Sequence, residues 1–279
     1  MKIAVLSGKG GTGKTLISVN LASVVGHSRY FDCDVEAPNG HLYLKSNHVE
    51  ETSATVNIPV VMHDQCTGCR ACVSFCRFNA LAFINGKVKV FESVCHSCGG
   101  CAYVCEENAI YEKEKTIGKI ERRQSNTIEV VSGRLNVGEE TGVPIIKKML
   151  KELGHSDKVT IIDCPPGSSC MVMESIQDAD YCVLVAEPTV FGTHNLEMVH
   201  ELVRFFNKPH GVVLNKNDEN QNPSADYCEK NNITIIGRIP FDVELGKLNA
   251  EGKIISNELS KYHQLFSEIY QNIRMEVEK

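Results

Sequence analysis

The sequence predicts an α/β fold with a doubly wound, mostly parallel sheet that is interrupted by a small α+β insert. Short runs rich in valine and isoleucine, without alternation, indicate strands that are covered on both faces. Stretches with helical spacing of apolar residues separate these runs, as in strand–helix–strand units with right-handed crossovers. The middle of the chain breaks this rhythm, because residues 66–83 and 95–112 are two copies of one pattern.

The expected elements follow one another along the chain. Buried strands are predicted at residues 2–8, 28–34, 158–164, 181–187, 210–215 and 233–240. Helices are predicted directly after the first strand and roughly at residues 142–154, 194–207, 224–231 and 258–275. The last helix is amphipathic, and its mixed charges favour packing on the core over binding to an anionic membrane.

The repeated segment has its own predicted structure. Between its two copies, residues 81–91 indicate a hairpin that turns at Asn85 and Gly86. The flanking residues 52–62 and 118–131 alternate apolar and polar side chains. We therefore expect strands there that attach the insert to the main sheet.

Composition limits the classes of function. The 279 residues suffice for one large domain, or for one domain with an insert. The net charge of −6 disfavours nucleic acid as a main partner. No apolar run is long enough to cross a bilayer, and the N-terminal run is too short for a secretory signal. Eight of the 13 cysteines form two arrays of identical spacing, which indicates metal ligation in a reducing compartment. We therefore expect a cytoplasmic protein.

Residues 8–15, GKGGTGKT, form a phosphate-binding loop between a predicted strand and a predicted helix. Its backbone amides and the helix N-terminus are suited to nucleotide phosphates. Lys14 is expected to reach the β- and γ-phosphates, and Thr15 to bind Mg²⁺. The remaining expected nucleotide-binding residues of the loop are Gly8, Lys9, Gly10, Gly11, Thr12 and Gly13.

The extra lysine, Lys9, makes this loop resemble the deviant phosphate loop of the MinD/ParA/Mrp group of ATPases. The resemblance implies that Lys9 crosses a dimer interface to the nucleotide of the partner subunit. It therefore implies a homodimer that forms with ATP. GTPases have a similar N-K-x-D motif, so the choice of ATP over GTP depends on this lysine.

Three further segments extend the resemblance, which covers about residues 1–45 and 130–279. The segment FDCDVEAPN implies that Asp34 positions the attacking water, with Asp32 in support. The segment VTIIDCPPG implies that Asp163 holds a Mg²⁺-bound water and that the Gly167 amide senses the γ-phosphate. Asn215, at the end of a later strand, is the expected adenine contact. We expect the ATPase domain at 1–63 and 114–279, with the insert at 64–113.

The thiol arrays have the C-x2-C-x2-C-x3-C spacing of bacterial ferredoxins. In that pattern the fourth cysteine of each run binds the other cluster. The resemblance thus implies a ferredoxin-like insert with two 4Fe-4S clusters. One would be held by Cys66, Cys69, Cys72 and Cys105, and the other by Cys95, Cys98, Cys101 and Cys76. Zinc is the main alternative, although zinc sites usually pair two C-x-x-C units.

Two departures from these families affect function. Arg77 and Glu106 replace the proline that usually follows a ferredoxin run. Cys170 falls seven residues after Asp163, where nitrogenase-type iron proteins have one ligand of a bridging cluster, but the upstream partner cysteine is missing. We therefore expect Cys170 to be a small buried side chain, like Cys182 in its apolar strand.

The resemblance leaves three functions open. The first is an ATP-gated electron-transfer protein with an unidentified redox partner. The second is an iron–sulfur cluster assembly or carrier ATPase, which lacks here the C-terminal C-x-x-C of Mrp-type carriers. The third is a regulatory or positioning ATPase whose clusters sense redox state or stabilise the insert. His194 is expected to be a loop histidine whose hydrogen bonds are satisfied. His96 is expected to be an exposed side chain.

Overall fold

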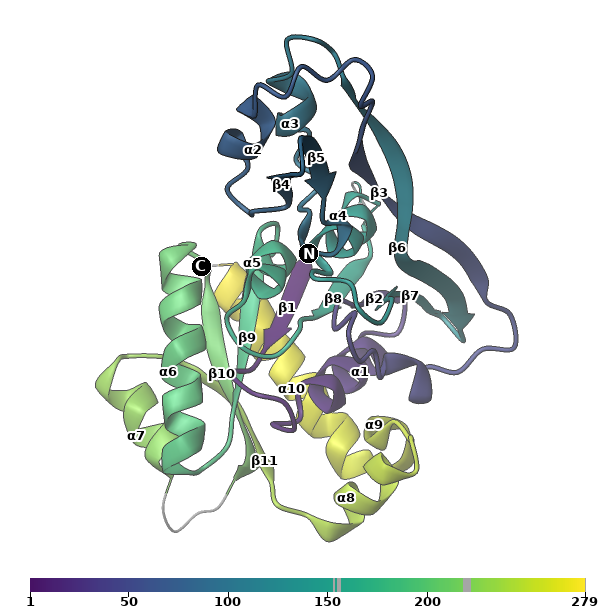
Figure 1. Cartoon of the computed structure of the whole chain (residues 1–279). Helices are drawn as coiled ribbons and strands as arrows, with labels where there is room; N and C mark the ends of the chain where they lie inside the picture. The colour runs from purple at the N-terminus through teal and green to yellow at the C-terminus, as the bar shows by residue number, and fades with distance from the viewer. Residues whose placement is uncertain (153, 155–156, 218–221, 279) are drawn as a thin grey trace.

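The computed structural model describes residues 1–152, 154, 157–217 and 222–278. Within these residues, nine strands form one sheet in the order β11-β10-β9-β1-β8-β2-β7-β6-β3 (Figure 1). The strands are β1 (Lys2–Leu6), β2 (Ser28–Asp32), β3 (Glu50–Val61), β6 (Ile110–Ser125), β7 (Ile128–Leu135), β8 (Val159–Asp163), β9 (Tyr181–Ala186), β10 (His210–Asn217) and β11 (Ile235–Pro240). The seven strands from β11 to β7 pair in parallel, and β6 and β3 are antiparallel. The predicted α/β class and mostly parallel sheet are confirmed.

Helices cover both faces of this sheet (Figure 1). One layer contains α1 (Lys14–Val25), α8 (Val243–Ala250), α9 (Ile255–Glu258) and α10 (Ser260–Val277). The other contains α4 (Val143–Lys151), α5 (Cys170–Ile176), α6 (Val190–Phe205) and α7 (Pro223–Lys230). In β1, Ile3 and Val5 pack into the first layer, whereas Ala4 and Leu6 pack into the second. Because both faces of the strand are buried, its sequence shows no alternation of polarity.

The predicted helices are found with shifted ends. The helix expected at 194–207 begins earlier, at Val190, because the Thr189 side chain accepts a hydrogen bond from the Gly192 amide and caps it. The helix expected at 142–154 is α4, and its predicted residue Leu153 lies outside the described residues. The terminal helix α10 packs on the core as expected. Its buried face consists of Tyr262, Phe266, Ile269 and Ile273.

The insert contains α2 (Ala71–Phe75), α3 (Gly100–Tyr103) and the hairpin of β4 (Leu81–Ile84) and β5 (Lys87–Val90). The predicted turn is confirmed, since Asn85 and Gly86 both have positive φ angles, 50° and 78°. Such a pair gives the type I′ turn that matches the twist of a two-stranded hairpin.

A long ribbon connects the insert to the main sheet (Figure 1). Strand β3 pairs with β6 over its whole length, and β6 then pairs with β7. The expected attachment is therefore confirmed, although residues 118–131 are parts of two strands rather than one. The predicted insert boundary at residue 113 falls inside β6, so the sheet continues from one part into the other.

The described helices include none that is long and apolar enough to cross a membrane. The two shorter helical segments, η1 (Gly40–Leu42) and η2 (Glu92–Val94), follow the second strand and the second hairpin strand.

Candidate nucleotide site and thiol arrays

The phosphate loop connects β1 to α1, and Lys14 is the first residue of that helix. The Lys14 Nζ atom lies 2.7 Å from Asp163 Oδ1 and 3.9 Å from Asp34 Oδ2. Burial lowers the pKa of the ammonium group, but the Asp163 carboxylate outweighs this effect and the net pKa is raised. Lys14 therefore remains charged beside the end of β8. The predicted residues Lys14, Asp34 and Asp163 are thus brought together.

Asp163 and Asp32 are held by buried donors. The Tyr30 hydroxyl donates to Asp163 Oδ2 at 2.8 Å, and the Gly40 amide donates to Asp32 Oδ2 at 2.8 Å. Burial and the Asp163 charge raise the pKa of Asp32 to about 7. Asp32 thus binds the backbone that follows β2, which fits its expected supporting role. Tyr30 was not predicted as a site residue, since in sequence it is one aromatic residue within an apolar strand.

Asp34 lies at the mouth of the same site. Its side chain retains 19% exposure, whereas that of Asp163 has none. Burial raises the pKa of Asp34, and the neighbouring Lys14 opposes that shift. A partly exposed carboxylate near the phosphate lysine is suited to positioning water. That role remains a prediction.

The remaining loop residues differ in their surroundings. A Cβ atom on Gly8 would lie 2.3 Å from the Asn195 carbonyl oxygen, so the start of the phosphate loop can approach α6 this closely because the residue is glycine. Gly10 and Gly11 have open space on that side. The Thr12 hydroxyl donates to the Lys9 carbonyl at 3.1 Å, and Thr15 is half-buried in the first turn of α1.

Lys9 is paired within its own chain. Its Nζ atom lies 2.8 Å from Glu187 Oε2 and 5.2 Å from the centre of the Phe191 ring. Lys216 binds the other oxygen of Glu187 at 2.6 Å and donates to the Gly11 carbonyl. Burial raises the pKa of Glu187, but the two lysines outweigh it and the net pKa is lowered. Glu187 was missed from sequence, although its position after β9, at the carboxyl edge of the sheet, was a usable signal.

Asn215 and Gly167, which are expected to contact the nucleotide, form hydrogen bonds to the loop region. The Asn215 amide donates to the Thr12 carbonyl at 2.8 Å, and a Cβ atom on Gly13 would lie 2.1 Å from that amide nitrogen. The Gly167 amide donates to the Ser7 carbonyl at 2.9 Å. Their expected contacts with adenine and γ-phosphate remain predictions. Both residues connect the loop to neighbouring strands.

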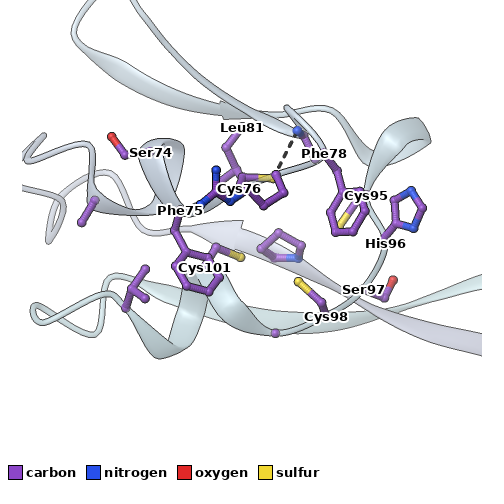
Figure 2. Close-up of a pocket in the computed structure, with 16 residues that line it drawn as sticks. Ser74, Phe75, Cys76, Phe78, Leu81, Cys95, His96, Ser97, Cys98 and Cys101 are labelled. Carbon is purple, nitrogen blue, oxygen red and sulfur yellow. Dashed lines mark hydrogen bonds between the residues drawn. The ribbon is translucent and has the colours of Figure 1, made fainter.

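The eight arrayed cysteines gather around two cavities. The larger, of about 500 Å³, is lined by Cys76, Cys95, Cys98 and Cys101 (Figure 2). The smaller, of about 20 Å³, is lined by Cys66, Cys69, Cys72 and Cys105. These are the two sets that the ferredoxin resemblance implies. The fold therefore brings the fourth cysteine of each run to the other run.

The two arrays share one backbone conformation. Three pairs of residues 29 positions apart all have positive φ angles: Gly68 and Ser97, Arg70 and Gly99, Asn79 and Asn108. Cys72 and Cys101 are buried, whereas Cys69 and Cys98 are exposed. The sequence repeat is thus also a repeat of local structure.

The fourth cysteines of the two runs, Cys76 and Cys105, have the same kind of contact with a backbone amide. The Ala80 amide lies 3.4 Å from Cys76 Sγ, and the Ala109 amide lies 3.3 Å from Cys105 Sγ. Burial raises the pKa of Cys72, and it raises the pKa of Cys101 to about 11. These thiols are protonated at neutral pH, so binding a metal would release protons.

Among the described residues, no three His, Cys, Asp or Glu side chains are placed to hold one metal ion.

Two expectations about the other cysteines and histidines are wrong. Cys182 is buried as predicted, but the expected burial of Cys170 is wrong, because Cys170 is exposed at the start of α5. His194 also differs from expectation, since it lies on the exposed side of α6 rather than in a loop. His96 is exposed and stacks on Phe78, with ring centres 3.8 Å apart.

A phosphate loop whose lysine faces the carboxylate that ends a parallel strand defines a nucleotide-binding protein of the doubly wound α/β class. The chain belongs to the CobQ/CobB/MinD/ParA nucleotide binding domain family, which matches residues 3–255. The expected relation to MinD and ParA is confirmed. The family match runs through the insert as well as the residues on either side of it.

Individual relatives agree with this assignment. An uncharacterized protein of Methanocaldococcus jannaschii is 32% identical over 286 residues, which cover 98% of this chain and 96% of that protein. The fold is similar to that of the cell division ATPase MinD of Pyrococcus furiosus, with a TM-score of 0.62, 19% identity and 98% of each chain covered. It is also similar to the septum site-determining protein MinD of Pyrococcus horikoshii complexed with Mg-ADP, with a TM-score of 0.61, 18% identity, and 96% and 93% covered.

Proposed function

We propose that this protein is a dimeric Mg·ATP-hydrolysing switch that carries two 4Fe-4S clusters in residues 64–113. Its nucleotide state would control electron transfer to, or binding of, a partner protein. The observation that carries the proposal is the grouping of eight cysteines into two four-thiol cavities on a phosphate-loop domain. The nucleotide half rests on family membership and on the loop geometry.

The nucleotide site has the groups that phosphoryl transfer needs. Lys14 supplies a buried positive charge, and Asp34 and Asp163 supply carboxylates within 4 Å of it. Such sites act by positioning and by charge stabilisation, with little covalent chemistry. In this proposal Thr15 and Asp163 bind Mg²⁺, and Asp34 orients the attacking water. The Gly167 amide would give up its hydrogen bond to the Ser7 carbonyl and donate to the γ-phosphate instead.

The thiol cavities fit iron–sulfur clusters in ligand type, number and grouping. Each has four cysteines, of which three come from one run and one from the other. A bound 4Fe-4S cluster supplies one-electron redox chemistry whose potential depends on hydrogen bonds to sulfur and on solvent access. The Ala80 and Ala109 amides would donate such hydrogen bonds. Zinc is the alternative, although zinc sites usually pair two C-x-x-C units rather than two runs of four cysteines.

The dimer would place Lys9 at the nucleotide of the partner subunit. Lys9 is on the surface beside the loop, with 34% side-chain exposure, and the adjacent Val190 and Phe191 are 78% and 63% exposed. Exposed apolar side chains that lie together are typical of a surface that another protein covers, since the core of an interface is apolar and its rim is polar. Formation of the dimer would require Lys9 to leave Glu187.

Anaerobic preparation tests both halves of the proposal. Analysis of iron and acid-labile sulfide should give about eight of each per chain, the content of two 4Fe-4S clusters. Purified protein should hydrolyse ATP in the presence of Mg²⁺, and Lys14→Gln should abolish this activity without loss of iron. Protein without iron and sulfide, or protein that does not bind Mg·ATP, would refute the corresponding half.

A further inference from the structure

A groove of about 880 Å³ lies between the insert and the nucleotide-binding part of the sheet. One wall belongs to the second thiol array, and the opposite wall contains Ser169, Cys170 and Met171 at the start of α5. The groove adjoins the larger thiol cavity, since the two spaces have lining residues in common. The residues that line both spaces are Phe78, His96, Ser97, Cys98 and Gly99.

The first thiol array has no comparable position. Every residue that lines its cavity lies between Val61 and Ile110, within the insert and its adjoining strand ends. The cavity of the second array, by contrast, shares Cys98 with a groove that reaches α5. The two arrays are therefore alike in local structure, but the cavity of the second, unlike that of the first, shares lining residues with the groove that reaches α5.

The segment from Asp163 to Cys170, which we name the β8–α5 segment, connects the nucleotide site to this groove. Asp163 binds Lys14 at 2.7 Å, and the Gly167 amide binds the Ser7 carbonyl at 2.9 Å. Prolines at 165–166 restrict the φ angles between these two contacts. The β8–α5 segment is therefore a short covalent path from the nucleotide site to Cys170, with the two prolines in its first half.

Helix α5 can transmit a displacement of this segment because its far side is packed. Val172 and Ile176 are fully buried in the core, whereas Cys170 is exposed and lines the groove. A change at the start of α5 therefore changes the groove rather than the core.

We propose that Mg·ATP selectively affects the second cluster, the one assigned to Cys76, Cys95, Cys98 and Cys101, through the β8–α5 segment and the groove. The first cluster, assigned to Cys66, Cys69, Cys72 and Cys105, does not respond. This inference rests on the proposed function. Its physical basis is that cluster potential depends on solvent access and on hydrogen bonds to the ligand sulfurs, and Cys98 is the ligand at the groove.

Thermodynamic linkage relates the shift in cluster potential to the change in nucleotide affinity. If a nucleotide binds the oxidised and reduced protein with tenfold different affinity, the potential of a one-electron cluster shifts by about 59 mV. Reduction must then change the affinity for that nucleotide by the same factor. The two quantities can be measured independently.

The first experiment is an anaerobic redox titration of the protein with both clusters, followed by electron paramagnetic resonance. It compares nucleotide-free protein with protein bound to Mg²⁺ and a non-hydrolysable ATP analogue, and Mg·ADP serves as a second ligand. We expect one cluster to shift and the other to keep its potential. The dissociation constant of the analogue, measured on oxidised and reduced protein, should change by the matching factor.

The second experiment identifies the responding cluster by its position. Among the described cysteines outside the arrays, Cys170 is exposed whereas Cys33, Cys164, Cys182 and Cys228 are buried. A nitroxide attached to Cys170 should relax faster when the responding cluster is reduced, and the ATP analogue should change that enhancement. Cys170→Ser, which cannot take the label there, is the matched control for stray labelling. Redox titration of the labelled protein verifies that the label leaves both potentials unchanged.

Several results would overturn the inference. They are equal shifts of both clusters, no shift in either, or a shifted cluster that does not relax the Cys170 label. Each of these requires normal iron content and normal binding of the analogue, so the proposed function would survive. Missing iron or missing nucleotide binding would overturn the inference together with the proposed function.

Discussion

The Nζ atom of Lys14 lies 2.7 Å from Oδ1 of Asp163, and both side chains are almost completely buried. Lys14, which we expect to bind phosphate, is thus paired with the carboxylate that we expect to serve Mg²⁺. Removing one member of a buried ion pair costs about 3–5 kcal/mol, because the other charge is left without compensation. The Lys14–Asp163 pair therefore contributes to the stability of the fold as well as to the nucleotide site.

Lys14→Ala should lower the free energy of unfolding by about 3 kcal/mol or more, because it leaves Asp163 buried without its cation. The double variant with Asp163→Asn should recover much of this loss, since no buried charge remains. Neither variant should bind Mg·ATP. Chemical denaturation and nucleotide binding measure the two effects. If the double variant were as unstable as Lys14→Ala, the ion pair would not be the source of the loss.

Asp32 should make the nucleotide-free protein less stable as pH rises. Its folded pKa of about 7 lies above the ordinary aspartate value of 3.8, because of burial and the charge of Asp163. Between these values the folded state holds a proton that the unfolded state has released. The contribution of Asp32 is therefore complete below pH 4 and is lost as pH rises toward 7.

Asp32→Asn isolates this contribution, because its side-chain oxygen can still accept the hydrogen bond from the Gly40 amide. Between pH 4 and 7 the wild type should lose stability relative to the variant, by up to about 1.4 kcal/mol per pH unit. Denaturation curves at several pH values measure the difference. Parallel pH profiles for the two proteins would contradict the prediction.

The pairing of cysteines between the two arrays is open to a direct test. Cys105→Ser and Cys66→Ser should weaken the same cluster and leave the same residual paramagnetic signal. Cys76→Ser should resemble Cys95→Ser instead, because Cys76 lines the cavity of the second array. Cys228→Ser, in the core beyond the arrays, is the control and should retain both clusters. The assignment would be contradicted if Cys76→Ser left the same residual signal as Cys66→Ser, which belongs to the same run, instead of the signal left by Cys95→Ser.

Lys9→Ala should weaken ATP-dependent dimerisation by about thirtyfold or more. Truncating one partner of a buried interfacial charge pair typically costs 2 kcal/mol or more, about thirtyfold. Light scattering of an Asp34→Asn background, in which ATP persists, measures the dimer. Lys216→Ala is the matched control, because Lys216 binds the same Glu187 but has no expected role across the interface. An equal loss of dimer in both variants would mean that Glu187, rather than a contact in the partner, explains the effect.

Much of the candidate site could be predicted from sequence because its motifs are local. The phosphate loop and both thiol arrays are continuous segments, and glycines and asparagines occupy most of the positive φ angles in them, with Arg70 and Ser97 as the exceptions. The hairpin at Asn85 and Gly86 was predictable for the same reason. Helix ends were less certain, since a side-chain cap such as Thr189 decides where α6 begins.

Residue order alone was enough to predict the parallel α/β class, the phosphate loop and the eight thiols in two equivalent runs. The folded chain was needed to show that Glu187 holds Lys9, that Tyr30 binds Asp163, and that Cys170 is exposed on a groove beside Cys98. Local motifs depend on neighbouring residues and their backbone angles. Contacts between distant segments depend instead on strand order and on which loops meet at the edge of the sheet.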